Sequence, residues 1–224
     1  MLVKQEFSAA NAPKMRAADI AYNAIESMIV KLELRPGSPV VEAELVEKTG
    51  LGRTPLREAL MRMSSNGLIV QMPRRGLVIS DIDASEYMNV IATRRVLEGL
   101  IAQQAAQLAT AEQRKDMLLW ADKMLIAAKC HDLGAYMAAD QAFDTIVHEA
   151  CGNPSAVQAV VPLVIQCRRF WYAYQHAGDV EEGARCHMLA AKAIAKGNAE
   201  LAVKASHGLM DYLVTFASEV MGKK

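Results

Sequence analysis

The stretch that decides the fold is GLGRTPLREAL, at residues 50–60. Its apolar side chains recur at helical spacing and can face a core. These apolar side chains are Leu56, Ala59 and Leu60, and Met63 continues the pattern just beyond the stretch. The first turn and a half then projects Arg53, Thr54 and Arg57 from the other side, where a recognition helix meets base edges and phosphates in the major groove. The pattern predicts a DNA-reading helix over 53–65, and the competing interpretation is a solvated basic face.

The segments around this helix predict a winged helix-turn-helix. Two further helices precede it, and two short β-prone runs follow it around a connection that contains Gly. The helices are expected at 17–32 and 42–48, the strands at 68–72 and 77–80, and the connection at 73–76. Three helices followed by a hairpin are typical of this motif. Arg74 and Arg75 would lie at the hairpin tip, from which an arginine can enter a minor groove or touch the DNA backbone.

Beyond residue 81 the sequence predicts only helices. They are expected at 84–109, 112–129, 133–151, 154–176, 180–196 and 199–221. Capping residues mark the ends of these helices. Asn153-Pro154, for example, is an N-cap followed by proline at the first helical position. The chain is therefore expected to be mainly α. It would have a flexible tail at 1–13, a winged helix-turn-helix domain at 14–80 and an all-helical bundle of six or seven helices at 81–224.

Charge and composition narrow the class of protein. The chain carries 25 Lys+Arg and 25 Asp+Glu, but five arginines and a single acid lie between residues 50 and 80. Basic chemistry is thus concentrated where DNA reading is predicted. The sequence contains no run of 18 apolar residues, so we expect no transmembrane helix. The N-terminus lacks the apolar core of a secretory signal. The four cysteines are widely spaced, so we expect reduced, buried thiols in a cytoplasmic protein with no membrane partner.

Residues 15–80 resemble the N-terminal domain of GntR-type transcriptional regulators. The matching segments, in order, are LRPG at 34–37, EL at 44–45, RTPLREAL at 53–60, NGLI at 66–69 and RG at 75–76. The resemblance implies that Arg53, Thr54, Arg57 and Gly76 contact DNA. This chain departs from the family at Gly52, where Ser or Thr usually caps the helix, and at Ala43, where some members carry a DNA-contacting Arg. We expect one contact fewer and unimpaired DNA binding.

Residues 84–221 resemble the FCD effector domain of the FadR-like branch of that family. The supporting segments are RRVLE at 94–98, DQAF at 140–143, CGNP at 151–154, and the two histidines at 187 and 207. The resemblance implies a divalent metal, zinc, nickel or manganese, held by Asp140, Asp144, His187 and His207. Asp140 and Asp144 are four residues apart and share one helix face. Asp144 departs from the family, which has His there, so the site is either more anionic or no longer binds metal.

Arg94 matches a family arginine that faces the effector cavity and can hold a carboxylate with two hydrogen bonds. The alternative is a salt bridge with Glu98, one helical turn further on. The aromatic cluster at 170–174, which follows Arg168 and Arg169, either lines a ligand pocket or packs the core. The implied effector is a small organic acid.

The sequence thus predicts a ligand-responsive transcriptional regulator rather than an enzyme, and no residue is assigned a catalytic role. A homodimer is expected, because a two-fold dimer reads two half-sites of operator DNA. Two alternatives stay open. One is a metal-dependent enzyme whose N-terminal half is a targeting module, and the other is a metal-free regulator that senses a larger acyl effector.

Overall fold

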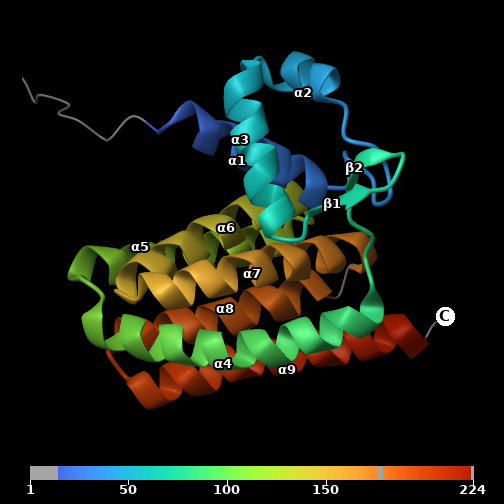
Figure 1. The fold of residues 1–224 in the computed structure, drawn as a ribbon. Coiled ribbons are helices and arrows are strands. Elements are labelled where there is room, and N and C mark those ends of the chain that lie inside the picture. Colours follow the sequence, from blue (N-terminus) through green and yellow to red (C-terminus); the bar gives the residue numbers. More distant parts are fainter. Residues whose placement is uncertain (1–14, 176–178, 223–224) are drawn as a thin grey trace, which may run out of the picture. The chain divides into compact units, whose positions relative to one another are not determined.

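The computed structural model describes residues 15–175 and 179–222 (Figure 1). Most of the residues before Asp81 form one compact unit, and those from Asp81 onward form a second. The predicted tail at 1–13 lies outside the described residues.

The N-terminal unit has three helices and a hairpin, as predicted. They are α1 (Ala17–Val30), α2 (Glu42–Thr49), α3 (Arg53–Ser65), β1 (Ile69–Met72) and β2 (Gly76–Ile79). The strands pair antiparallel, with Ile69 opposite Ile79 and Met72 opposite Gly76. Each element contributes to an apolar core, in which the buried side chains include Ile25, Ile29, Leu45, Leu56, Leu60, Met63, Ile69 and Val78.

Glycine sets the turn between α2 and α3. Gly50 ends α2 with φ of 67°, and its N–H donates to the carbonyl of Val46. A side chain would strain this left-handed conformation, so the tight turn requires glycine. Gly52 then caps α3 without a side-chain hydrogen bond, which leaves N–H groups at the helix start for another partner.

The sequence did not predict the third segment that pairs with the hairpin. Pro39 forms an isolated antiparallel bridge with Val78. The N–H of Ile79 donates to Ser38, and the N–H of Val40 donates to Leu77. The extended chain before α2 therefore lies along β2 and fixes the base of the wing.

The C-terminal unit is all-helical over its described residues, and its helices lie within a few residues of the predicted ranges. They are α4 (Ala84–Leu108), α5 (Ala111–Lys129), α6 (Leu133–Ala150), α7 (Pro154–Tyr174), α8 (Asp179–Ala195) and α9 (Ala199–Gly222). Side-chain caps explain several starts. Asp83 caps α4, Asp132 caps α6 and Asn153 caps α7, while Thr110 and Gln113 form a capping box on α5.

The helices of this unit pack into a bundle around an apolar core. The most extensive pairing joins α4 and α9, which run side by side in Figure 1, and α5 packs on both α6 and α8. Between α4 and α9, a Cβ built on Gly99 would come 2.9 Å from His207 Nε2, so a side chain at this position would displace the His207 ring. None of the described helices is long and apolar enough to cross a membrane.

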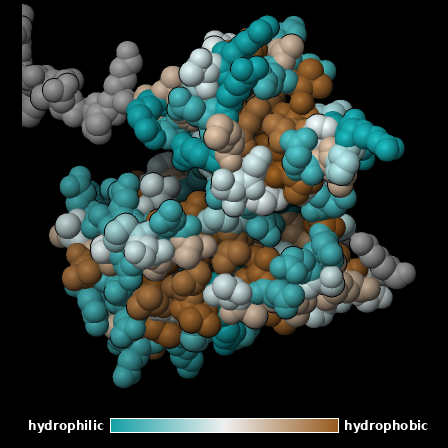
Figure 2. Space-filling model, in the orientation of Figure 1, coloured by the Kyte–Doolittle hydropathy of each residue, from teal (hydrophilic) through white to brown (hydrophobic). Residues whose placement is uncertain are grey.

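Some apolar side chains of the C-terminal unit remain on its surface. Figure 2 shows apolar surface gathered on the helical unit, and on α4 the exposed side chains include Val96, Leu100 and Leu108. Cys151, Cys167 and Cys186 are buried free thiols, as expected. The prediction of a buried thiol is wrong for Cys130, which follows the end of α5 and is exposed.

Candidate DNA-binding face and effector pocket

The outer face of α3 carries the residues predicted to read DNA. Arg53, Thr54 and Arg57 are exposed on its first turn and a half. The opposite face is buried through Leu56, Ala59, Leu60 and Met63. Two guanidinium groups and a hydroxyl are therefore presented beside the helix N-terminus, whose N–H groups favour a phosphate.

Glu42, at the start of α2, is a partner of Arg57 that sequence reasoning missed. Arg57 Nε lies 2.9 Å from Glu42 Oε2 and 3.2 Å from Oε1. The side chains are 64% and 36% exposed, so solvent screens the pair and its contribution to stability is small. Both contacts use Nε, so neither terminal nitrogen of Arg57 takes part in them. The pair limits the orientations of Arg57 without occupying the nitrogens that a guanine edge requires.

The tip of the wing exposes Arg74, Arg75 and Gly76. Arg75 Nη2 donates to the carbonyl of Gly37 at 3.1 Å, which ties the tip to the segment before α2. Gly76 has φ of 74°, although a Cβ there would meet nothing within 4 Å. Backbone conformation rather than lack of space therefore favours glycine at this position.

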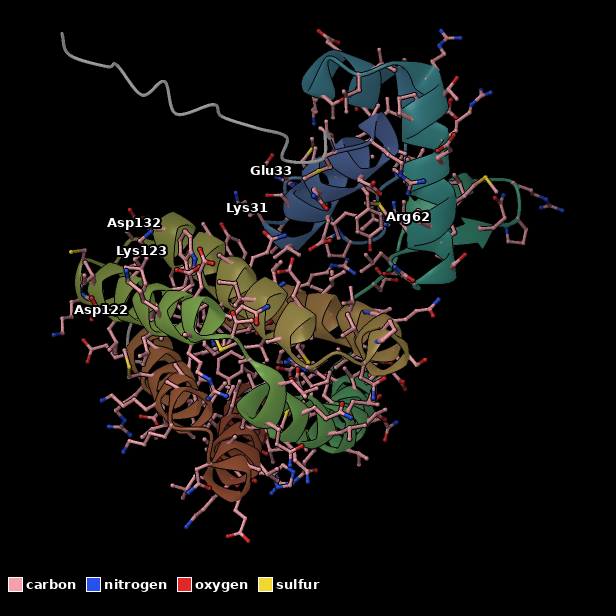
Figure 3. All side chains as sticks on the ribbon, turned by 90° about the vertical axis from the view of Figure 1, so that its left-hand side faces the viewer. Lys31, Glu33, Arg62, Asp122, Lys123 and Asp132 are labelled. Carbon is pink, nitrogen blue, oxygen red and sulfur yellow. The ribbon has the colours of Figure 1, made fainter. Side chains whose placement is uncertain are left out.

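Arg62 differs from the other arginines of this region because it supports the fold. Its Nη1 lies 2.7 Å from Asp19 Oδ1, and its guanidinium lies 4.4 Å from the ring centroid of Tyr22. Figure 3 shows Arg62 on α3, beside α1. These contacts join α3 to α1, so we assign Arg62 no DNA contact.

The C-terminal unit contains a pocket with a volume of about 50 Å³. Its walls come from α4, α6, α7, α8 and α9. The polar and charged side chains that matter most are Arg94, Asp140, Asp144, Arg168 and His187, and Leu209 contributes an apolar wall. The pocket is therefore small and rich in charge, as suits a small polar ligand.

Arg168 joins the two predicted carboxylate ligands. Its Nε lies 2.5 Å from Asp140 Oδ2, and its Nη2 lies 2.7 Å from Asp144 Oδ2. The other oxygen of Asp140, Oδ1, lies 3.1 Å from His187 Nε2. His187 Nδ1 lies 2.8 Å from the carbonyl of Gly183, a hydrogen bond that orients the ring. The sequence placed Arg168 beside an aromatic cluster but did not predict this bridge, because it depends on how α6 and α7 pack.

The charges in this network shift the pKa values of its members. Burial alone would raise the pKa of Asp140, but Arg168 and His187 outweigh it and hold that pKa well below its usual range. Burial raises the pKa of Asp144, and the positive charge of Arg168 offsets only part of this rise. Burial would lower the pKa of His187, yet its hydrogen bond to Asp140 prevails and the pKa is raised. Asp140 therefore stays ionised between two donors.

The structure brings Asp140, Asp144 and His187 to the pocket and leaves His207 away from it. His207 Nε2 instead lies against Gly99 of α4, and the residues that α9 places on the pocket wall are Leu209, Tyr212 and Leu213. Two residues along a helix correspond to a rotation of about 200°, so His207 and Leu209 face nearly opposite directions. Among the described residues, no three His, Cys, Asp or Glu side chains are grouped so that they could hold a metal ion. The residues present, with a guanidinium between the two carboxylates, do not fit a metal.

Arg94 is the residue that the resemblance assigns to the effector. It lines the pocket, and it forms the salt bridge with Glu98: Nη2 and Nε lie 2.6 Å and 3.2 Å from Glu98 Oε1. Arg94 is only 5% exposed. A buried guanidinium that already holds a carboxylate is suited to hold the carboxylate of a ligand.

The aromatic cluster divides between core and pocket. Phe170 is fully buried and stacks on Tyr87, with ring centroids 3.8 Å apart. Trp171 lines the pocket, and its Nε1 donates to the Tyr212 hydroxyl at 2.7 Å. The cluster therefore supports the pocket wall as well as the core.

A winged helix-turn-helix with exposed arginines, followed by a helical domain with a charged pocket, defines a DNA-binding transcriptional regulator. Residues 17–79 match the family of bacterial regulatory proteins called the gntR family, and residues 89–212 match the FCD domain. The chain belongs to the GntR-type transcriptional regulators that carry an FCD domain. These families are regulators, which argues against the alternative of a metal-dependent enzyme.

Several relatives bear regulatory names. The HTH-type transcriptional repressor RspR of Escherichia coli strain K12 is 25% identical over 168 residues, which cover 75% of this chain and 74% of that protein. A probable D-xylose utilization operon transcriptional repressor of Paenarthrobacter nicotinovorans is 26% identical over 180 residues, 79% of this chain and 78% of the relative. An uncharacterized HTH-type regulator of Agrobacterium vitis is 29% identical over 131 residues, 57% of this chain and 77% of the relative.

Solved structures share the fold. The structure of McbR/YncC from E. coli superposes with a TM-score of 0.80 at 16% identity and covers 92% of this chain and 99% of that one. A GntR regulator from Rhodococcus sp. RHA1 superposes with a TM-score of 0.67 at 18% identity, with coverage of 92% and 98%. At these identities the likeness establishes architecture alone.

Proposed function

We propose that this regulator binds a small organic acid in the pocket of its helical unit and that binding changes its affinity for operator DNA. The observation that carries the proposal is Arg94, a buried guanidinium on the pocket wall whose present partner is the carboxylate of Glu98. A ligand carboxylate of the same geometry can take the place of Glu98 at Arg94. Arg94 then keeps an anionic partner throughout the exchange, while the displaced carboxylate of Glu98, 13% exposed, loses its cation.

Operator binding is assigned to Arg53, Thr54 and Arg57 on α3 and to Arg75 and Gly76 on the wing. All five are exposed, and their elements occupy the positions of a recognition helix and its wing. Arg53 and Arg57 would reach base edges or phosphates, and Arg75 would contact phosphate. A DNA-bound regulator of this kind works in the cytoplasm.

The active form is proposed to be a homodimer. One winged helix-turn-helix offers few base contacts, and two copies related by a two-fold axis read two half-sites. Exposed apolar side chains of α4, Val96 and Leu100 among them, supply surface that a second copy would cover. Equilibrium sedimentation should give twice the monomer mass, and a monomer at micromolar concentration would overturn this part of the proposal.

Two matched relatives are named repressors. We propose that this chain is also a repressor, so its ligand should release operator DNA. The test begins with a duplex recovered from a random-sequence pool by the untagged full chain. The affinity for this duplex is then measured against a panel of mono- and dicarboxylates, with uncharged sugars of similar size as controls. Release by a carboxylate alone supports the proposal, whereas release by a sugar or by no compound in the panel contradicts it.

A further inference from the structure

We propose that Arg168 is the fixed cation of the effector pocket, in the place that the FCD resemblance gives to a divalent metal, so that the effector is bound without metal. This inference rests on the proposed function, because it concerns the same pocket. It names the kind of ligand that the pocket takes: a carboxylate recognised by guanidinium groups and not by chelation.

The position of the guanidinium carries the inference. Arg168, from α7, reaches both aspartates of α6 with separate nitrogens, Nε to Asp140 and Nη2 to Asp144. Its side chain is 12% exposed, and those of the two aspartates are 11% and 17% exposed. The fork of a guanidinium fits two carboxylates in this way, whereas an ammonium would act as a point charge. The oxygens that would ligate a metal are therefore already neutralised from within the chain.

The donor set also departs from that of a metal site. Asp140 Oδ1, the oxygen that Arg168 does not use, accepts from His187 Nε2, so the imidazole nitrogen that would bind a metal is directed at a carboxylate. On α9 the residues of the pocket wall are Leu209, Tyr212 and Leu213, none of which is a histidine or a carboxylate, while His207 packs against Gly99. A divalent ion placed among these groups would lie beside a permanent positive charge and would have too few ligands.

Arg168 and Arg94 then have different roles in the pocket. Arg168 neutralises Asp140 and Asp144 and so holds α6, α7 and α8 around the cavity. Arg94, on α4, is the guanidinium whose partner can be exchanged for a ligand carboxylate. A chelating hydroxyl beside that carboxylate should therefore add no metal-dependent affinity.

The experiment measures metal content and metal response in untagged protein purified without chelator. The wild type should carry no stoichiometric metal, and Zn²⁺, Ni²⁺ or Mn²⁺ should not raise its melting temperature. Arg168→Ala removes the cation, and Arg168→Ala with Leu209→His adds an imidazole on the pocket wall. The double variant should take up about one equivalent of Zn²⁺ and regain thermal stability with it. Arg185→Ala, which removes a side chain that is 69% exposed on α8, is the matched control and should behave as the wild type.

Stoichiometric metal in the wild type that is lost in His187→Ala would overturn the inference. This outcome does not depend on whether the Arg168 variants fold. The inference would also fail if release of the selected duplex by a carboxylate required metal and stopped in EDTA. Release that persists in EDTA supports it. If no carboxylate releases the duplex, the proposed function fails, and the metal content of the wild type still decides the role of Arg168.

Discussion

The two units use arginine in opposite ways. On the DNA-reading unit, Arg53, Arg57 and Arg75 are exposed, and the one acidic partner found for Arg57 is itself screened by solvent. In the effector unit, Arg94 is buried and Arg168 is largely buried, at 12% exposed, and each is held by a carboxylate or two. Exposed cations can be transferred to phosphate at little cost, because water solvates them in the free protein. Buried cations require a counter-ion in the free protein, so a ligand must compete with a residue already in place.

Removing Arg168 should have the largest effect, because it leaves the buried carboxylate of Asp140 and the largely buried carboxylate of Asp144 without their cation. Arg168→Ala is expected to lower the free energy of unfolding by about 3–5 kcal/mol, measured by urea denaturation. The control Arg185→Ala should stay within about 0.5 kcal/mol of the wild type. An Arg168 variant as stable as that control would show that the bridge between α6 and α7 is not needed.

Removing Arg57 should be the largest single loss in DNA affinity. Arg57→Ala is expected to weaken binding of the selected duplex by about 1–3 kcal/mol, measured by fluorescence anisotropy at fixed salt. Lys123→Ala, on α5 of the other unit (Figure 3), makes the same change in net charge and should leave affinity nearly unchanged. Equal losses in the two variants would mean that net charge, and not a contact from α3, governs affinity.

Glu98 should limit the affinity of Arg94 for the ligand. Glu98→Gln removes the competing negative charge and keeps the shape of the side chain. We expect it to tighten carboxylate binding about tenfold, or about 1.4 kcal/mol, in calorimetric titrations. Unchanged or weaker carboxylate binding in this variant would contradict the exchange at Arg94, and Glu182→Gln, on α8 outside the pocket lining, serves as the control.

The smallest predicted effect is that of Arg75 at the wing tip. If it contacts phosphate, Arg75→Ala should weaken all duplexes about equally and reduce the slope of log affinity against log salt by about 1. The measurement is a salt titration with the selected duplex and a scrambled duplex. A loss confined to the selected duplex would instead assign Arg75 a contact with a base.

The sequence predicted the fold well because its signals are local. Asn153-Pro154 begins α7, with the Asn153 side chain accepting from the N–H of Ala156, and Gly50 ends α2. The face proposed to read DNA was equally accessible, because Arg53, Thr54 and Arg57 lie on one helix whose periodicity fixes their direction. By contrast, the pairing of Pro39 with Val78 spans a long stretch of chain and left no local pattern.

The pocket was predicted only in part, because it is made by residues of five helices. Spacing alone placed Asp140 and Asp144 on one face, and the resemblance added Arg94 and His187. Which face of α9 turns inward depends on its rotation against α4, and an error of two residues exchanges His207 for Leu209. The bridge from Arg168 to the two aspartates depends on the register of α6 against α7, which cannot be predicted from the sequence of either helix alone.

The central claim is that one pocket and one DNA-binding face are thermodynamically coupled. The measurement that tests it most directly is the dissociation constant of the releasing carboxylate, determined by calorimetry with and without saturating duplex. Linkage requires that the duplex lower the affinity for the ligand by the same factor by which the ligand lowers the affinity for the duplex. We predict equal factors of about 5–150, the usual range for such coupling. A carboxylate that binds equally well to free and DNA-bound protein would contradict the account.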